Sequence, residues 1–346
     1  MGKHTELIDG GLRSLVGTRK FYKKVLLVAV PIMIQNGITN FVSLLDNIMV
    51  GQVGTEQMSG VAIANQLVFI FNLCIFGAVA GAGILSAQFY GSGNAEGVRD
   101  TFRFKLLFGV ILSAIFAVIF LTVGEPLIQQ FIHQGEGIGD LEATRSYGKA
   151  YLEVIVIGIL PFALTQCYSG TLRETGETVI PMIGGIIAVC VNLVFNYILI
   201  FGKLGAPELG CVGAAIATVL SRFVELAIVA GWTHKHVARN PFIRGALRSF
   251  KIPGSLLKQI IAIGLPLFIN ELMWSFGITF MTQCYSVRGL EVVAAFNIAN
   301  TISNVFNVVF LSLGNAVGII IGQMLGAGRL EEAKKSEGPS GLRGRQ

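Results

Sequence analysis

The chain alternates between long apolar stretches and short polar ones along nearly its whole length. A helix needs about 20 apolar residues to cross the hydrocarbon core of a bilayer. Eight stretches reach that length, at about 25–50, 58–86, 104–123, 149–170, 179–201, 211–232, 260–284 and 292–322. This pattern predicts an all-α polytopic membrane protein that crosses the bilayer eight times.

The composition supports a membrane protein and excludes other classes. Of the 346 residues, 53% are hydrophobic and 13% charged, whereas a soluble domain carries roughly a quarter charged residues. The 43 glycines also agree with a bundle of membrane helices, because small residues let such helices approach closely. The net charge of +6 does not indicate a nucleic-acid partner, because the cations gather in particular loops.

Lysine and arginine are distributed unevenly between the loops, and in membrane proteins the basic loops face the cytoplasm. The N-terminal tail (1–24) and the even-numbered loops are basic, and the segment 233–259 is the most basic of all. Loop two contributes Arg99, Arg103 and Lys105, and loop four contributes Arg173. The odd-numbered loops are poor in cations. The pattern predicts a multi-pass protein of the cell membrane with both termini in the cytoplasm.

An internal repeat appears when the chain is shifted against itself by 235 residues. Pro31 then falls on Pro266, and "QFYGSGNAE" (88–96) falls on "QMLGAGRLE" (323–331). The register holds without a gap over about 70 residues, which indicates a true repeat. Six spans separate the two copies. Because six is even, both copies enter the membrane in the same direction, as in a parallel repeat of two six-helix bundles.

The repeat defines the expected domains. After the tail (1–24) come an N-terminal six-helix bundle (25–232), a basic cytoplasmic connector (233–259), the first two helices of a C-terminal bundle (260–325) and a cytoplasmic tail (326–346), disordered at 336–346. The second copy thus holds two helices of an expected six. We expect a truncated or frame-shifted version of a longer protein with twelve helices, in preference to a natural short form.

Asp46 is the deepest carboxylate of the first bundle, near the end of the first span in "SLLDNIMVG". Ionisable residues inside membrane spans are functional hypotheses by default, because burying their charge is costly. No cation lies nearby in sequence, so polar groups of other helices, a bound cation or a proton must satisfy the charge. A position at the level of the lipid headgroups is the structural alternative.

The fifth and sixth spans offer partners for such a carboxylate. Asn192 and Asn196 are four residues apart and therefore share a helix face, and Thr218 lies in the next span. Amide and hydroxyl oxygens are hard ligands that suit a small cation. Interhelical hydrogen bonds between the amides are the alternative.

Other polar residues inside spans have weaker signals. Glu271 lies near the middle of the seventh span, Glu153 near the start of the fourth, and Arg222 and Glu225 in the sixth. Arg222 and Glu225 are three residues apart and can pair on one helix face, so we interpret them as a structural ion pair. For Glu153 we favour an interfacial position.

Pro31 and Pro266 occupy matched positions early in spans one and seven. A proline inside a helix frees a carbonyl and permits a kink. The two prolines are therefore candidates for either static bends or hinges.

Several motifs together resemble a known family. "LLDNIMVG", "GVAIANQ", "NLVFNYILIFG" and "GLPLFINELMWSFG" are similar to the multidrug and toxic compound extrusion (MATE) transporters, over about residues 20–335. The resemblance implies two six-helix bundles that open alternately to the cytoplasm and the outside. It implies export of organic cations and other amphiphilic drugs in exchange for H⁺ or Na⁺, with no cofactor besides the coupling ion.

The resemblance also assigns roles to residues. Asp46 matches the carboxylate of the proton or cation site, and Asn192 and Thr218 match residues that help to form it. Asn196 falls where many relatives carry a second aspartate, so the identity of the ion stays open. A Na⁺ ion would bind at Asp46, Asn192 and Asn196, and Glu271 resembles the acid of the second bundle.

Three other functions compete with drug antiport. A lipid-linked oligosaccharide flippase of related fold tends to have a cationic cavity, whereas Arg222 is the one cation that we place well within a span. An intramembrane enzyme would need a helix-borne HExxH, GxSxG or paired aspartates, which we do not find, so we expect no enzyme. The chain could also be an inactive subunit that depends on a partner chain for the missing helices. We expect the 346-residue chain alone not to catalyse coupled export.

Overall fold

The computed structural model describes residues 19–132, 140–249, 251–286 and 290–329. Within these ranges the chain forms eight long helices and three short 3₁₀ turns, and no strand. The long helices are α2 (Arg19–Gly51), α3 (Thr55–Gly91), α4 (Ala95–Ile132), α5 (Leu141–Glu174), α6 (Val179–Ile200), α7 (Gly210–Lys235), α8 (Gly254–Ser286) and α9 (Leu290–Gly326). The 3₁₀ turns are η1 (Lys203–Gly205), η2 (Pro241–Ile243) and η3 (Ala246–Arg248).

All eight expected spans are confirmed as helices long and apolar enough to cross a membrane. Most extend several residues beyond the apolar stretch that predicted them. α2 begins at Arg19, so the last residues of the expected N-terminal tail are helical. The segment expected to be disordered, 336–346, lies outside the described residues.

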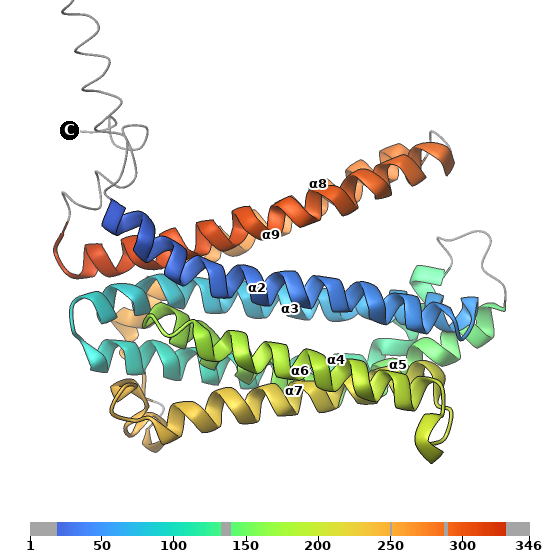
Figure 1. Ribbon diagram of the computed structural model, residues 1–346, viewed down its shortest axis with the longest axis horizontal. Coiled ribbons are helices and arrows are strands. Elements are labelled where there is room, and N and C mark those ends of the chain that lie inside the picture. Colours follow the sequence, from blue (N-terminus) through green and yellow to red (C-terminus); the bar gives the residue numbers. More distant parts are fainter. Residues whose placement is uncertain (1–18, 133–139, 250, 287–289, 330–346) are drawn as a thin grey trace, which may run out of the picture.

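Helices α2 to α7 lie side by side and form one bundle (Figure 1). Its largest core cluster joins α3, α4, α5 and α7 around Phe71, Ile75, Ile155 and Ile159, each at most 1% exposed. Lipid chains are as apolar as these side chains, so close packing rather than water exclusion holds membrane helices together.

Glycine permits the close contact of α3 with α5. A Cβ at Gly60 would lie 2.6 Å from the carbonyl oxygen of Thr144 and 2.7 Å from the backbone nitrogen of Gly148. Both distances are shorter than side chains tolerate, so the two backbones meet here because neither Gly60 nor Gly148 carries a side chain.

The basic segment between α7 and α8 packs against the end of the bundle and is no free linker. Phe242 of η2 is 2% exposed and contacts the ring of Phe102 in α4 at a centroid distance of 5.4 Å. Arg103 of α4 donates from Nε to the carbonyl of Ala246 (2.9 Å) and from Nη2 to that of Gly245 (2.8 Å). Arginines that the sequence assigned to loop two therefore hold this segment against α4 by hydrogen bonds.

The end of the molecule where this segment lies is called the connector side, and the opposite end is called the far side.

Helices α8 and α9 meet the bundle at the connector side and diverge from it toward the far side (Figure 1). One buried cluster joins Val28, Ala29 and Ile32 of α2 to Ala316 and Ile320 of α9. A second cluster joins α3 and α4 to the start of α8. Further along, α8 and α9 expose large apolar side chains, and Phe276 of α8 is 72% exposed.

The repeat expected from sequence is visible in matching helix ends. α3 and α9 both end before a glycine in the left-handed region, Gly93 at φ +75° and Gly328 at φ +73°. The backbone hydrogen bonds around these two glycines are also equivalent. In α3, Ser92 N donates to Gln88 O (3.0 Å) and Asn94 N donates to Phe89 O (2.8 Å). In α9, the matching bonds run from Ala327 N to Gln323 O (3.0 Å) and from Arg329 N to Met324 O (2.9 Å). The 235-residue shift thus relates structure as well as sequence.

Candidate ion-coupling site

Asp46 lies in α2, five residues before the end of the helix, and is half-buried against α6. Its Oδ1 accepts a hydrogen bond of 2.5 Å from Nδ2 of Asn196. Asn196 is 1% exposed and Asn192 is 6% exposed, one helical turn away on the same face of α6. The shared helix face expected from their spacing is therefore observed.

The side-chain amide of Asn192 completes the contact with the carboxylate. In one orientation its nitrogen donates to Oγ1 of Thr218 in α7 (3.3 Å) and its oxygen accepts from Asn196 (3.2 Å). In the reversed orientation the nitrogen donates to Oδ1 and Oδ2 of Asp46, at 3.0 and 3.1 Å. Asp46, Asn192, Asn196 and Thr218 thus form one connected set, which we name the Asp46 group.

The amide of Asn192 satisfies the bare carboxylate in the orientation that turns its nitrogen toward Asp46. With the amide oxygen turned toward the carboxylate, two hydrogen-bond acceptors would face each other and would need a proton or a small cation between them. The carboxylate can therefore be stabilised by two amide donors, one from Asn192 and one from Asn196.

The Asp46 group offers a bound ion the oxygens of one carboxylate, two side-chain amides and one hydroxyl. These are hard oxygen ligands, suited to Na⁺, and the carboxylate can also take a proton. Among the described residues, no cluster of three or more His, Cys, Asp or Glu could hold a metal ion. The chemistry favours a weakly held monovalent ion over a transition metal.

The other predicted residues do not join the Asp46 group. Glu271 is exposed on α8, and none of the group's hydrogen bonds reaches it. Pro31 and Pro266 lie inside α2 and α8, which continue as helices through both prolines. The hinge role of these prolines remains a prediction.

A second set of polar residues lies elsewhere in the bundle, and the part that Arg173 plays in it was not anticipated. Arg173, assigned to loop four from sequence, belongs to the last turn of α5 and donates from Nη2 to Oε1 of Gln35 in α2 (2.6 Å). Arg222, one turn from Thr218 on α7, lies 5.1 Å from the ring centre of Phe162, in cation–π range. Buried nitrogens of both residues, Arg173 Nε and Arg222 Nη1, have no hydrogen-bond partner.

The expected ion pair between Arg222 and Glu225 takes a different form. Within the described part of the chain, the ion pairs closer than 4 Å do not include this pair. Glu225 instead lies within electrostatic range of two guanidinium groups, those of Arg173 and Arg222, at distances longer than an ion pair. Arg173 comes from α5, so the spacing on a single helix could not reveal this arrangement.

Lys105 and Glu174 form a buried ion pair between α4 and α5. Nζ of Lys105 lies 2.5 Å from Oε2 of Glu174, and the two side chains are 0% and 8% exposed. Nζ also donates to Oγ1 of Thr171 (3.2 Å). Lys105 was expected as a loop cation, and this assignment was wrong. The pair links residues 69 positions apart, so no local pattern identifies it.

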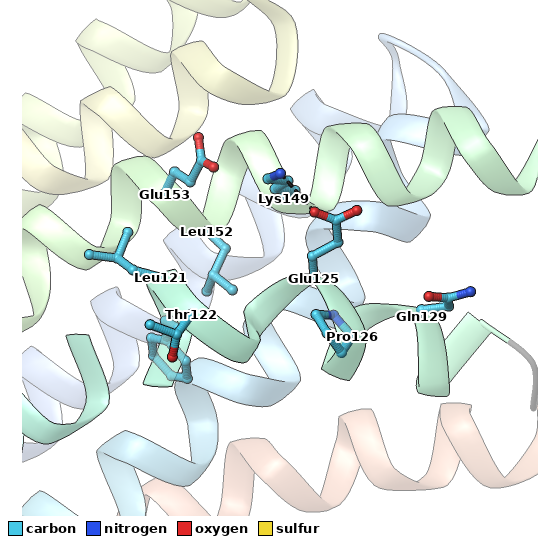
Figure 2. Close-up of a pocket in the computed structure, with 9 residues that line it drawn as sticks. Leu121, Thr122, Glu125, Pro126, Gln129, Lys149, Leu152 and Glu153 are labelled. Carbon is cyan, nitrogen blue, oxygen red and sulfur yellow. Dashed lines mark hydrogen bonds and ion pairs between the residues drawn. The ribbon is translucent and has the colours of Figure 1, made fainter. Parts of the chain in front are cut away.

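A pocket of about 330 Å³ opens between α4 and α5 near the far side (Figure 2). Its lining includes Glu125, Lys149 and Glu153, and none of the Asp46 group. Glu125 is held by Lys149 and by Arg145, each at 2.7 Å. The charges of this pocket are largely paired and solvated, and we assign it no role in ion coupling.

Replacing Asn196 with Asp tests the donor set directly. Two carboxylates this close cannot both remain ionised without a proton or cation between them. We expect Asn196→Asp to bind Na⁺ or retain a proton at least about tenfold more tightly at neutral pH. Titration of the purified chain with Na⁺ and with acid measures this change. Asn196→Leu, which adds no charge, should show no such gain, and equal affinities in the two variants would contradict the arrangement.

Comparison with known proteins places these features in context. The family model described as MatE matches residues 31–198 and 266–337. A probable multidrug resistance protein NorM of Thermotoga maritima is 30% identical over 312 residues, which cover 89% of this chain and 64% of that protein. The chain thus spans less than two thirds of that relative's length.

Solved structures agree with the sequence comparison. A crystal structure of MATE in complex with MaD3S superposes with a TM-score of 0.81 at 25% identity, over 94% of this chain and 70% of that one. An outward-facing conformation of a multidrug resistance MATE family transporter of the MOP superfamily gives a TM-score of 0.78 at 25% identity, over 94% and 69%.

A repeated bundle of membrane-spanning helices around a half-buried carboxylate is typical of membrane transporters rather than of enzymes. The match to the family model covers more than half of the chain, in both copies of the repeat. The chain therefore belongs to the MatE family of multi-pass membrane transporters.

Proposed function

We propose that this chain is the ion-coupling part of a secondary active antiporter. The transporter exports drugs or other organic cations and amphiphiles in exchange for H⁺ or Na⁺, by alternating access. The Asp46 group is the site of the coupling ion. The observation that carries the proposal is the placement of Asp46 within a membrane-spanning helix, 2.5 Å from one buried amide and next to a second.

The proposed mechanism uses competition for one carboxylate. Asp46 with a proton or Na⁺ is neutral and tolerates the bundle interior. Release of the ion leaves a negative charge that the amides of Asn192 and Asn196 can stabilise by donation. A change in the ion thus changes the hydrogen bonds between α2, α6 and α7, and these helices can couple ion binding to the shape of the bundle.

The proposed location is the cell membrane, with the connector side in the cytoplasm. The support is the basic character of the tail and connector. Two cations counted for loops two and four, Lys105 and Arg173, make hydrogen bonds between helices instead. The connector itself retains six lysines and arginines: Lys235, Arg239, Arg244, Arg248, Lys251 and Lys258.

The exposed position of Glu271 bears on activity. A carboxylate near the middle of a membrane helix costs at least about 2.5–3.5 kcal/mol when it faces lipid. We propose that further helices cover this face of α8 in the working transporter and that coupled export depends on them. Co-expression with a segment supplying such helices should raise export above that of the 346-residue chain alone.

Reconstituted transport tests the proposed function. The chain is placed in proteoliposomes, with the covering helices co-reconstituted, and a fluorescent cationic drug is followed under an imposed pH gradient or an imposed Na⁺ gradient. We expect drug movement against its own gradient with one of the two ions. Equal drug movement with and without either gradient would contradict ion-coupled antiport.

One observation favours a second candidate, the transport of an anionic or lipid-linked amphiphile. Arg173 and Arg222 bring two positive charges into the bundle beside the single carboxylate of Glu225. An anionic headgroup would satisfy their unpartnered nitrogens. Competition decides between the two: an anionic amphiphile that blocks cation transport in the parent chain but not in Arg173→Gln would support this candidate.

A further inference from the structure

The contact between α3 and α9 lies on the axis that relates the two copies of the repeat. Residues separated by 235 positions face each other across it. A Cβ at Gly322 would lie 3.1 Å from the Cβ of its equivalent, Ala87. The next turn of each helix brings two further equivalent pairs into the same contact, Gln88 with Gln323 and Gly91 with Gly326.

The two glycines make the approach reciprocal. A Cβ at Gly91 would overlap the carbonyl oxygen of Gln323, and a Cβ at Gly326 would overlap that of Gln88. Each carbonyl is fixed, because it accepts the bond that ends its own helix, from Ser92 N or Ala327 N. Backbone overlap cannot be relieved by rotating a side chain. The helices can cross this closely because both positions lack a Cβ.

Side-chain hydrogen bonds extend the contact to the rest of the first bundle. Gln323 donates from Nε2 to the carbonyl oxygen of Glu174 at the end of α5 (2.8 Å). Its Oε1 accepts from Nζ of Lys24 in α2 (3.5 Å). One residue of α9 thus touches three helices of the bundle at the connector side.

The same two helices separate toward the far side. On α9, Phe306 is 60% exposed and Phe310 67% exposed, whereas Ala316 and Ile320, nearer the crossing, are fully buried. Figure 1 shows the divergence of α8 and α9 from α2 and α3. The bundle and the α8–α9 pair are therefore joined at the connector side in this conformation.

We propose that the α3–α9 crossing is the connector-side seal of the transporter. It is closed in this conformation and must separate when the connector side opens. This inference rests on the proposed alternating access. Gly91 and Gly326 set the balance between the two states, since they allow the close approach that makes the closed state favourable. A methyl group at either position shifts the population toward the open state.

Disulfide trapping measures the seal without any transport assay. Ala87→Cys and Gly322→Cys are introduced in the full 346-residue chain after the five native cysteines are replaced by serine. The Cβ separation of 3.1 Å lies slightly below the usual value of about 3.8 Å for a disulfide, so the pair should oxidise readily in proteoliposomes. We expect Gly91→Ala and Gly326→Ala each to slow cross-linking by about tenfold or more.

Gly318→Ala is the matched control, because Gly318 lies on the same helix, α9. A Cβ at this position would meet nothing within 4 Å. Its cross-linking rate should change less than about twofold. Gln323→Ala leaves the backbone unchanged and should slow cross-linking severalfold by removing the bond to Glu174. The proposal is overturned if Gly91→Ala, Gly326→Ala and Gln323→Ala all cross-link at the parent rate. Because trapping reads proximity, a chain that transports nothing can still confirm or overturn the seal.

Discussion

Asp46→Asn is expected to abolish gradient-driven export while leaving the folded bundle intact. The substitution keeps the size of the side chain, and an amide can still contact Asn192 and Asn196. It removes the charge, so neither a proton nor Na⁺ can be exchanged at this position. Drug accumulation against its own gradient, measured in proteoliposomes with the covering helices co-reconstituted, should fall to the level of protein-free vesicles. Binding of the drug itself should survive, because binding does not require ion exchange.

A matched carboxylate separates coupling from general charge effects. Glu153→Gln also removes one carboxylate from a membrane-spanning helix, and Glu153 lines the pocket between α4 and α5, away from the Asp46 group. Export by Glu153→Gln should remain near the parent level. The role of Asp46 would be wrong if Asp46→Asn still concentrated the drug, or if both substitutions reduced export equally.

Lys105→Met is expected to be the most destabilising single substitution in the bundle. It leaves the carboxylate of Glu174 buried and without its cation, and breaking a buried ion pair in this way costs about 3–5 kcal/mol. The side chain of Lys105 is fully buried and its Nζ lies 2.5 Å from Oε2 of Glu174. The apparent melting temperature of the purified chain in detergent should drop by several degrees or more.

Two controls test the physical cause of that loss. In the double variant Lys105→Met with Glu174→Gln, no uncompensated charge remains, and much of the stability should return. Lys149→Met removes a lysine whose ion pair with Glu125 is open to solvent. The side chain of Lys149 is 48% exposed and that of Glu125 is 34% exposed. Solvent-exposed ion pairs contribute little to stability, so this variant should melt near the parent temperature. Equal losses at Lys105 and Lys149 would contradict the account.

The membrane spans were predictable from sequence because hydropathy reports directly on the bilayer. The Asp46 group was largely predictable as well, since the spacing of Asn192 and Asn196 fixes a common face on α6. Their contact with Asp46 joins residues 150 positions apart. That contact could be expected from the resemblance to known transporters and not from local pattern.

The cations that bond between helices were not predictable in the same way. Lys105 and Arg173 occur at the ends of apolar stretches, where a solvated loop residue and a helical residue packed inside the bundle look alike. Their positions depend on Glu174 and Gln35, which come from other helices. The repeat predicted that α3 and α9 are equivalent, but their reciprocal crossing depends on how the two copies pack.

The account depends most on the claim that Asp46 holds the coupling ion. Its most direct test is a titration of the purified 346-residue chain with Na⁺, with proton release recorded in the same experiment. The account predicts that the parent chain binds Na⁺ or exchanges one proton, and that Asp46→Asn loses this event while keeping its helical content. Identical Na⁺ binding and proton release in the two proteins would contradict it.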